Sequence, residues 1–262
     1  MCFLKRYTDI SEKKTLEGFS GVIDMHSHFL PFADDGSRSV EESLNMLKLS
    51  YSQGVRRIVA TPHFYPESES PDEFILKREK SVMALRDALE KKREIGETFP
   101  EVYVGAEVAF FNGMSRCADL DKLCVIGTKL LLLEMPFEKW TETVIEELIA
   151  IKNARGLTPV IAHIERYAFV QKKRIIEQIF SEGILIQANA EAFISGIMKN
   201  VIMRMLADGK IDVIGSDCHD ILHRPPNMDK AIVKIQDRLG SKRVEELTEL
   251  GNSLLKNAQR IM

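Results

Sequence analysis

The stretch GVIDMHSHFLPFADDG, residues 21–36, places two histidines directly after a short apolar run. Side chains of a β-strand alternate between its two faces, so His26 and His28 point to the same side if the run is a strand. Pro31 and the Asp-Asp-Gly turn at 34–36 then redirect the chain. The stretch predicts a buried strand whose carboxyl end directs two imidazoles into one space.

Apolar runs and helical patterns alternate along the rest of the chain. The runs are short, β-branched and apolar enough to be buried on both faces, which favours a parallel sheet and an α/β fold. Predicted strands lie at 22–24, 55–60, 101–106, 130–133, 158–163, 183–189 and 212–217. Predicted helices lie at 39–54, 71–96, 141–156, 171–183 and 194–210. Ser39 and Glu42 offer a capping box for the first helix.

No internal repeat, low-complexity tract or Pro/Gly/Ser-rich linker interrupts the 262 residues. We therefore expect one domain over residues 21–262, because barrels of this length commonly remain single domains. Residues 1–20 are predicted to be a polar extension, since they carry lysines and glutamates where a signal peptide needs an apolar core. No apolar run is long enough for a membrane span.

The charge balance argues against nucleic acid and anionic membranes as partners. The 36 basic and 39 acidic side chains give a formal net charge of -3, which produces no field that attracts polyanions. The four cysteines form no C-x-x-C pair, as expected of free thiols in a reducing compartment. We expect a cytoplasmic protein that recognises any phosphate group locally.

Each predicted strand is followed by a side chain that binds metals or forms hydrogen bonds. In chain order these are His26 and His28, His63, Glu107, Glu134, His163, Asn189, and Asp217 with His219. An open sheet gathers ligands at one crevice, whereas a barrel collects them from all its strands at one rim. The pattern therefore favours a barrel.

A lone histidine is most often a packing residue, but this set is different. Neutral imidazoles beside carboxylates at a water-poor rim are costly unless a cation binds them. Nitrogen and oxygen donors without thiolate suit zinc, manganese or iron, and their number exceeds what one ion needs. We expect two or three divalent ions, held by His26, His28, Asp35, His63, Glu107, His163, Asp217 and His219.

Several motifs carry a resemblance to a known family. DMHSH, DDGSRSVEES, VATPH, GAE, PVIAHIERY and SDCHDILHRPP follow one another between residues 21 and 230. Together they resemble the bacterial metal-dependent protein tyrosine phosphatases of the PHP (polymerase and histidinol phosphatase) superfamily. The resemblance implies a distorted TIM-like (β/α)7 barrel of the PHP type with a trinuclear metal centre, manganese being the first choice and iron or zinc the alternatives.

The resemblance also implies roles for individual residues. The same eight side chains would bind the metals, and Arg166 and Arg224 would contact the phosphate. A metal-bridging hydroxide would attack the phosphomonoester in line, without a phosphoenzyme, and His223 or a metal-bound water would supply any proton that the leaving group needs. The partner would be a phosphotyrosine protein, namely a bacterial tyrosine kinase of capsule or exopolysaccharide synthesis.

Other functions fit parts of the pattern. A phosphatase for a small metabolite such as histidinol phosphate needs the same centre, and a deep, closed pocket would favour it. A phosphodiesterase or exonuclease is disfavoured because no basic stripe supports nucleic-acid binding. A non-enzymatic metal-binding regulatory module is disfavoured, because holding a metal ion does not require phosphate donors such as Arg166 and Arg224.

The sequence leaves several residues open between functional and structural roles. Glu134 and Asn189 are as well explained by strand ends as by the metal site, and Asp34 by the turn. Phe137 and Trp140 fit a packed loop better than a pocket for an aromatic substrate.

Two features near the motifs need separate interpretation. Cys218 and Arg224 match the C-x5-R pattern of cysteine-dependent phosphatases, but the intervening residues include no glycine and two prolines follow, so we reject that chemistry. After His63 the family often continues with a polar residue, whereas here Phe-Tyr-Pro follows at 64–66. That loop is expected to form part of the pocket wall, where it affects substrate preference.

Overall fold

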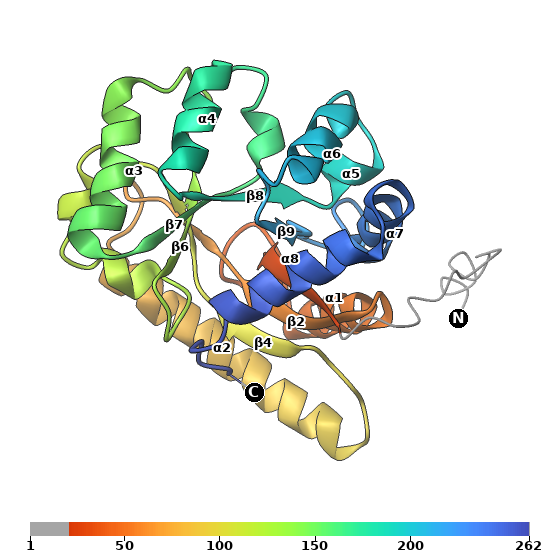
Figure 1. Cartoon of the computed structure of the whole chain (residues 1–262). Coiled ribbons are helices and arrows are strands. Elements are labelled where there is room, and N and C mark those ends of the chain that lie inside the picture. The colour runs from red at the N-terminus through yellow and green to blue at the C-terminus, as the bar shows by residue number, and fades with distance from the viewer. Residues whose placement is uncertain (1–20, 262) are drawn as a thin grey trace.

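The computed structural model describes residues 21–261, and the predicted polar extension at 1–20 lies outside them. A curled parallel sheet forms the centre, and helices cover its outer face (Figure 1). The strands are β1 Val22–Ser27, β2 Val55–Ala60, β3 His63–Phe64, β4 Glu101–Val104, β5 Glu107–Ala109, β6 Leu130–Glu134, β7 Thr158–Ile161, β8 Leu185–Asn189 and β9 Val213–Gly215.

Helices connect these parallel strands, as crossover connections require, except between β2 and β3 and between β4 and β5. The α-helices are α1 Val40–Ser52, α2 Pro71–Glu94, α3 Glu142–Arg155, α4 Lys173–Ser181, α5 Glu191–Ile194, α6 Lys199–Ala207, α7 Met228–Leu239 and α8 Ser241–Leu254. Short 3-10 helices lie at η2 Met114–Arg116, η3 Leu120–Leu123 and η4 Ile164–Arg166. The sequence patterns did not predict α5, α7 or α8, whereas the predicted helix at 194–210 contains α6 and begins at the last residue of α5.

The strand order runs β1-β2-β4 in one ladder and β3-β5-β6-β7-β8-β9 in the other. β3 continues the path of β2 after a break at Pro62, which has no amide hydrogen for the ladder. β5 continues β4 in the same way. Hydrogen bonds from Gly105 N to Ala60 O (2.8 Å) and from Glu107 N to Pro62 O (3.0 Å) carry the pairing across the break. The two ladders therefore form one curved sheet.

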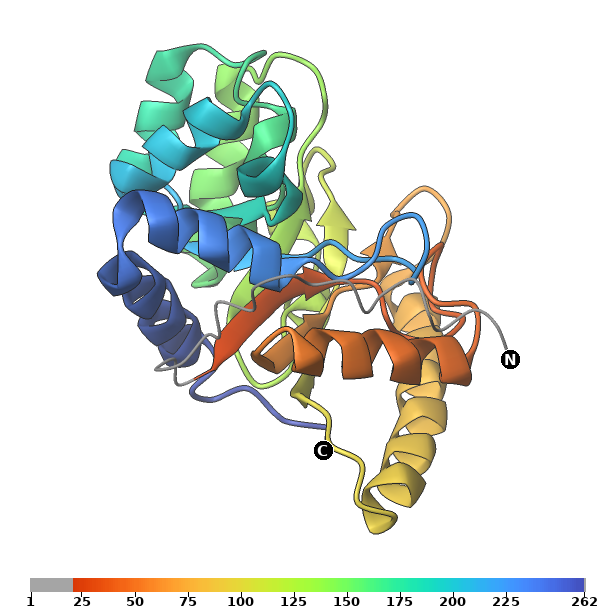
Figure 2. The same cartoon turned by 90° about the vertical axis from the view of Figure 1, so that its right-hand side faces the viewer.

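The sheet curls until its last strand lies beside its first. Ser27 and Cys218 form a parallel bridge beyond the ends of β1 and β9. Asp217 N donates to His26 O at 2.8 Å, and His28 N donates to Cys218 O at 2.9 Å. This seam confirms the distorted TIM-like barrel, and it brings the loops after β1, β3 and β9 to one side of the molecule (Figure 2).

Both faces of the sheet are buried, as its apolar runs predict. Alternate residues of β6 divide between two clusters: Leu131 and Leu133 pack in the large core with residues of α3, whereas Leu130 and Leu132 belong to a smaller second core. Leu255, just after α8, completes the second core. Each strand is therefore held on two sides, which fixes the direction of the side chains at its carboxyl end.

The helices begin where local capping predicts. Ser39 caps α1 by accepting from Glu42 N at 3.1 Å. The predicted capping box is only half formed, because the Glu42 carboxylate accepts from Arg38 N at 2.8 Å and not from Ser39 N. A complete capping box forms instead at Ser70 and Glu73, at the start of α2.

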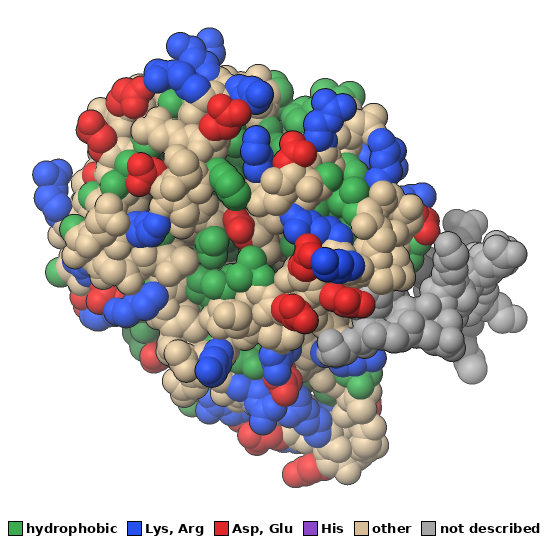
Figure 3. Space-filling view, in the orientation of Figure 1, with side chains coloured by type: hydrophobic (Ala, Val, Ile, Leu, Met, Phe, Trp, Pro, Cys, Tyr) green, Lys and Arg blue, Asp and Glu red, His purple; other side chains and the backbone are tan. Residues whose placement is uncertain are grey.

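Within the described residues, no helix combines the length and hydrophobicity of a membrane span. On the face of the molecule seen in Figure 3, acidic and basic side chains are interspersed, so that face carries no stripe of one sign.

Gly215 is the residue whose substitution tests the seam. A methyl group there would lie 2.4 Å from His26 Cβ and 2.8 Å from His26 N, so β9 and β1 would have to separate. We expect Gly215→Ala to lower the free energy of unfolding by about 1–3 kcal/mol, the usual cost of overpacking. Urea denaturation measures this change.

Gly251→Ala in α8 is the matched control. Its methyl group would meet the end of the Ile23 side chain at 3.1 Å, and alanine gains helix propensity of about 1 kcal/mol. Equal destabilisation by both substitutions would contradict the packing argument.

Candidate metal centre

His26 and His28 lie side by side at the end of β1. Both side chains are fully buried, and their Nε2 atoms are 3.0 Å apart. Asp34 accepts from His28 Nδ1 at 2.6 Å, which leaves Nε2 of that ring directed toward His26. Two ring nitrogens that lie this close together and face the same space are suited to binding metal cations as ligands.

The loop after β1 returns to the same space. Asp34 Oδ1 accepts from Gly36 N at 3.0 Å, and its Oδ2 accepts from His63 N at 3.0 Å. Asp34 therefore does more than form the turn, because it also orients His28. A Cβ on Gly36 would lie 2.0 Å from His28 O, so only glycine permits this return. Asp35 follows with an exposed side chain, and its Oδ1 lies 3.5 Å from His219 Nε2.

Glu107 is the buried carboxylate at the centre of the cluster. Its Oε2 lies 3.1 Å from His26 Nε2, 3.3 Å from His28 Nε2 and 3.1 Å from His63 Nδ1. Its Oε1 lies 2.7 Å from His163 Nε2. Burial by itself would raise the pKa of this carboxyl, but the charge of His26 and hydrogen bonds from the imidazoles hold it well below its usual range. Glu107 is thus an anion with imidazoles around it.

Asp217 joins this cluster to two arginines. Its Oδ1 lies 3.4 Å from His28 Nε2 and 3.7 Å from His26 Nε2. Its Oδ2 accepts from Arg166 Nη2 at 2.7 Å and lies 2.8 Å from Arg224 Nη2. Both guanidinium groups are partly exposed, so each keeps donors free for a ligand at the mouth of the site.

Backbone strain is concentrated in the same residues. Among residues 21–261, positive φ at a non-glycine residue occurs at Phe32, His163 and Asp217, with φ of 60°, 33° and 53°. Such conformations cost about 1–3 kcal/mol each and persist where the surrounding structure holds them, most often at functional sites. Two of these residues are in the predicted ligand set, and Phe32 lies on the loop that carries Asp35.

Among residues 21–261, three groups of donors have ligand atoms within 4.8 Å of one another: His28, Asp35, His63 and His219; His26, His28 and Asp217; His63, Glu107 and Glu134. Seven of the eight predicted ligands belong to them, and His163 contacts the third group through Glu107. Glu134, which the sequence left open, belongs to the third group.

The donor chemistry fits divalent cations. Within the described structure, His63 Nδ1 and His219 Nε2 are buried and form no hydrogen bond, although carboxylate oxygens of Glu107 and Asp35 lie 3.1 Å and 3.5 Å from them. Buried polar atoms are rarely left unpaired, so such atoms need an explanation, and a bound ion is one of the usual ones. Both atoms belong to residues of the donor groups, so the site matches the metal that the sequence predicts.

Sequence reasoning missed Gln187. Its Oε1 accepts from His163 N at 2.6 Å and lies 3.3 Å from His26 Nδ1, so it orients a residue of each of two distant strands. Its Nε2 donates to Asn189 Oδ1 at 2.9 Å, and Asn189 donates to Asp217 at 2.8 Å. A glutamine within the apolar run at 184–189 was the signal that could have revealed this network.

The remaining candidates lie apart from the donors. His223 has a largely exposed side chain that pairs with Asp220 at 3.6 Å. Cys218 is buried in the core, and burial raises the pKa of its thiol to about 12. Trp140 packs into its loop and donates to Pro136 O at 2.9 Å, as expected of a structural residue. Phe137 is exposed.

These features define a class of protein: an α/β barrel with a cluster of candidate metal-binding side chains at the carboxyl ends of its strands and two arginines beside that cluster. The comparison with known families is more specific. Residues 22–262 match the family model of CpsB/CapC, described as capsular polysaccharide synthesis. The chain belongs to this family.

Individual relatives agree with this assignment. The chain is 30% identical over 255 residues to the tyrosine-protein phosphatase CpsB of Streptococcus agalactiae serotype V, covering 90% of this chain and 99% of that protein. It is 29% identical over 247 residues to the tyrosine-protein phosphatase YwqE of Bacillus subtilis, covering 90% and 92%.

Solved structures show the same barrel. A crystal structure from work on YwqE of Bacillus subtilis and CpsB of Streptococcus pneumoniae, called unique metal-dependent tyrosine phosphatases, covers 91% of this chain and 96% of that chain with a TM-score of 0.75 and 25% identity. A dihydropyrimidinase from Brevibacillus agri covers 92% of this chain and 72% of its own, with a TM-score of 0.53 and 11% identity, which supports the fold alone.

The metal assignment predicts a thermal effect that does not depend on activity. Adding Mn2+ to chelator-stripped protein is expected to raise Tm, because a ligand at 100 times its Kd stabilises a folded protein by about 2.7 kcal/mol. Glu107→Ala should abolish the shift.

Gln187→Leu should weaken metal affinity about 10–100-fold, the usual effect of removing a group that orients a ligand. Calorimetric titration measures that affinity.

His223→Ala is the control, because it removes a histidine outside the cluster. A Tm that responds to neither Mn2+, Zn2+ nor Fe2+ would contradict the assignment, as would a loss of affinity in His223→Ala equal to that in Glu107→Ala.

Proposed function

We propose that this protein is a metal-dependent phosphomonoesterase that hydrolyses phosphotyrosine in proteins, with a bacterial tyrosine kinase of capsule or exopolysaccharide synthesis as its substrate. The observation that carries the proposal is the convergence of imidazoles and carboxylates around Glu107, with Arg166 and Arg224 beside them. Family membership supports the same activity, because tyrosine phosphatases are among the named relatives.

The metal ligands in this proposal are His26, His28, Asp35, His63, Glu107, His163, Asp217 and His219, with Glu134 as an addition suggested by its place in the third donor group. Two or three ions, manganese first and iron or zinc as alternatives, suit nitrogen and oxygen donors in this number. When bound, such ions supply Lewis-acid chemistry that neutralises phosphate oxygens and makes hydroxide available near neutral pH.

Arg166 and Arg224 act on the phosphate in this proposal. Each shares Asp217 Oδ2 through one Nη atom, so the carboxylate holds both guanidinium planes at the mouth of the site. Planar forked donors match the oxygens of a phosphoryl group and stabilise the charge that spreads over them during transfer. A tyrosine leaving group, with a pKa near 10, needs less help from a proton donor than an alkyl alcohol does.

The open mouth of the site supports a protein substrate over a small metabolite. Side chains at the mouth of the site are partly exposed: 33% for Arg166 and 43% for Arg224, which would meet the phosphate, and 69% for Asp35, a proposed metal ligand. A histidinol phosphatase needs the same donors but gains from a pocket that encloses the whole substrate. The proposal further assigns the activity to a single domain, residues 21–262, that works in the cytoplasm.

A comparison of three substrates tests the proposed function. Chelated enzyme, restored with Mn2+, Zn2+ or Fe2+, is assayed on p-nitrophenyl phosphate, a phosphotyrosyl peptide and histidinol phosphate. We expect hydrolysis of the first two and little of the third, because an open site favours an aryl phosphate on a polypeptide. Turnover of histidinol phosphate alone would refute the protein-phosphatase proposal while leaving the metal centre intact.

The nucleophile is tested by a pair of substitutions. Cys218→Ser is expected to keep most of the activity, because the thiol is buried in the core and not among the donor groups. His26→Ala is expected to lower kcat by at least about 100-fold, the scale of losing a key electrostatic group. Steady-state rates on p-nitrophenyl phosphate measure both. Comparable losses in the two variants would support cysteine chemistry instead.

A further inference from the structure

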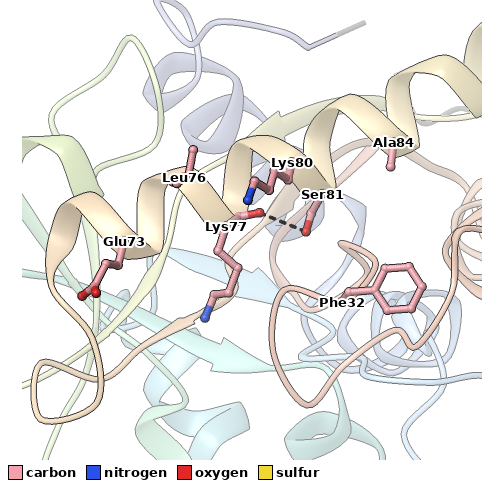
Figure 4. A pocket seen from close by; sticks show the side chains of 7 residues that line it. All are labelled: Phe32, Glu73, Leu76, Lys77, Lys80, Ser81 and Ala84. Carbon is pink, nitrogen blue, oxygen red and sulfur yellow. Dashed lines mark hydrogen bonds between the residues drawn. The ribbon is translucent and has the colours of Figure 1, made fainter.

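A groove of about 360 Å³ lies between the loop after β1 and the first half of α2. Its lining residues are Phe32, Glu73, Leu76, Lys77, Lys80, Ser81 and Ala84, and Figure 4 shows Phe32 on its loop across from the α2 side chains. The groove contains none of the donor atoms of the metal centre. Its role is therefore separate from the phosphate-binding site, although the same loop carries Asp35.

Phe32 is held in the groove at an energetic cost. Its backbone has a φ of 60°, which is unfavourable for a bulky residue, and its side chain is 66% exposed. Phe32 N donates to Ser37 O at 2.9 Å, and Ser37 N donates to His28 O at 3.0 Å, so this conformation is tied to a residue of the metal centre. A strained backbone that presents an aromatic ring to solvent indicates a contact surface.

The walls of the groove combine apolar and basic character. Phe32, Leu76 and Ala84 supply apolar surface. Lys77 pairs with Glu69 at 2.7 Å, but Lys80 has no ion-pair partner within residues 21–261. Glu73 is occupied at the start of α2, where it accepts from Ser70 N at 2.9 Å. An occupant that carries an apolar side chain and a negative charge would complement this surface.

Exposed apolar side chains continue around the same end of the barrel. The loops after β3, β6 and β9 present Tyr65, Phe137 and Leu222, the segment between η4 and α4 presents Phe169, and the loop between α5 and α6 presents Ile197. Tyr65 stacks on His63, with ring centroids 5.1 Å apart and planes 21° from parallel. A ligand that places a phosphoryl group among the donors must pass this apolar rim. A polypeptide that carries the phosphoryl group continues on both sides of it, so it can contact the rim and the groove as well as the donors.

We propose that the groove between Phe32 and α2 binds the polypeptide segment that flanks the phosphotyrosine of a protein substrate, and that it prefers a segment with apolar and acidic side chains. This inference rests on the proposed function and adds a determinant of substrate selection outside the metal centre. Phe32 and Leu76 receive the apolar side chain of the segment, and Lys80 pairs with its carboxylate.

The experiment compares kcat/KM of the full-length enzyme for three probes. These are p-nitrophenyl phosphate and two phosphotyrosyl peptides of equal length, one flanked by leucine and glutamate and the other by serine and lysine. We expect the wild type to prefer the first peptide. Leu76→Ala and Lys80→Glu should each lower kcat/KM for that peptide about tenfold, the scale of losing one interface anchor, and should change the rate on p-nitrophenyl phosphate less than twofold.

Matched controls lie near the far end of α2. Ile95→Ala removes an exposed apolar side chain of similar size, and Lys91→Glu makes the same charge reversal on an exposed lysine of the same helix. Neither should alter the preference between the peptides. Phe32→Ala is a third groove variant, and its rate on p-nitrophenyl phosphate reports whether the loop still holds Asp35 and His28.

The outcomes separate the two proposals. Activity of the wild type on none of the probes would refute the proposed function itself. Hydrolysis of all probes with no preference between the peptides, or with equal losses in groove and control variants, would refute the groove alone. A change in oligomeric state in Leu76→Ala, measured by sedimentation, would also refute it by showing that the groove binds a second copy of the chain.

Discussion

The contact between Glu107 and the surrounding imidazoles is the interaction on which the site depends. A fully buried carboxylate is costly unless cationic or hydrogen-bonding groups surround it, and here His26, His28, His63 and His163 do so. Together with Glu107, these residues come from four different places in the chain, so no local segment can satisfy Glu107. The barrel must close before the site exists. The two cores behind the strands then hold the imidazoles close together despite the repulsion between them.

Breaks in the strands give the site its room. A continuous second strand would carry its ladder past Ala60, but Pro62 interrupts it and lets His63 turn toward Glu107. Gly105 produces the matching break in the next strand, where a Cβ would lie 2.9 Å from a methyl group of Val125. Two small irregularities therefore separate the part of the sheet that supplies stability from the part that supplies ligands. On the opposite side of the sheet, the strained backbone at His163 and Asp217 likewise separates the strands that supply stability from the residues that supply ligands.

The fold and the assembly of the donors could be predicted because both depend on periodicity. Runs such as 22–24 and 130–133 are buried on both faces, and the polar residues after them must gather at one rim if the sheet closes. The sequence could not decide the role of Glu134, because its membership of a donor group depends on where His63 lies across the sheet. It did not reveal Gln187, which acts through contacts with residues 24 and 161 positions away. Nor did it show that Asp34 orients His28, since a turn explains that residue equally well.

The seam between β1 and β9 has a consequence for biosynthesis. It joins Ser27 to Cys218, which lie far apart in the chain. The first two histidines therefore leave the ribosome long before Asp217 and His219 are synthesised. Contacts this distant in sequence form slowly, because a long loop must close before they gain any stabilisation. A nascent chain that lacks its final strand has only part of the donor set, so the complete set of donors assembles late, after translation of nearly the whole barrel.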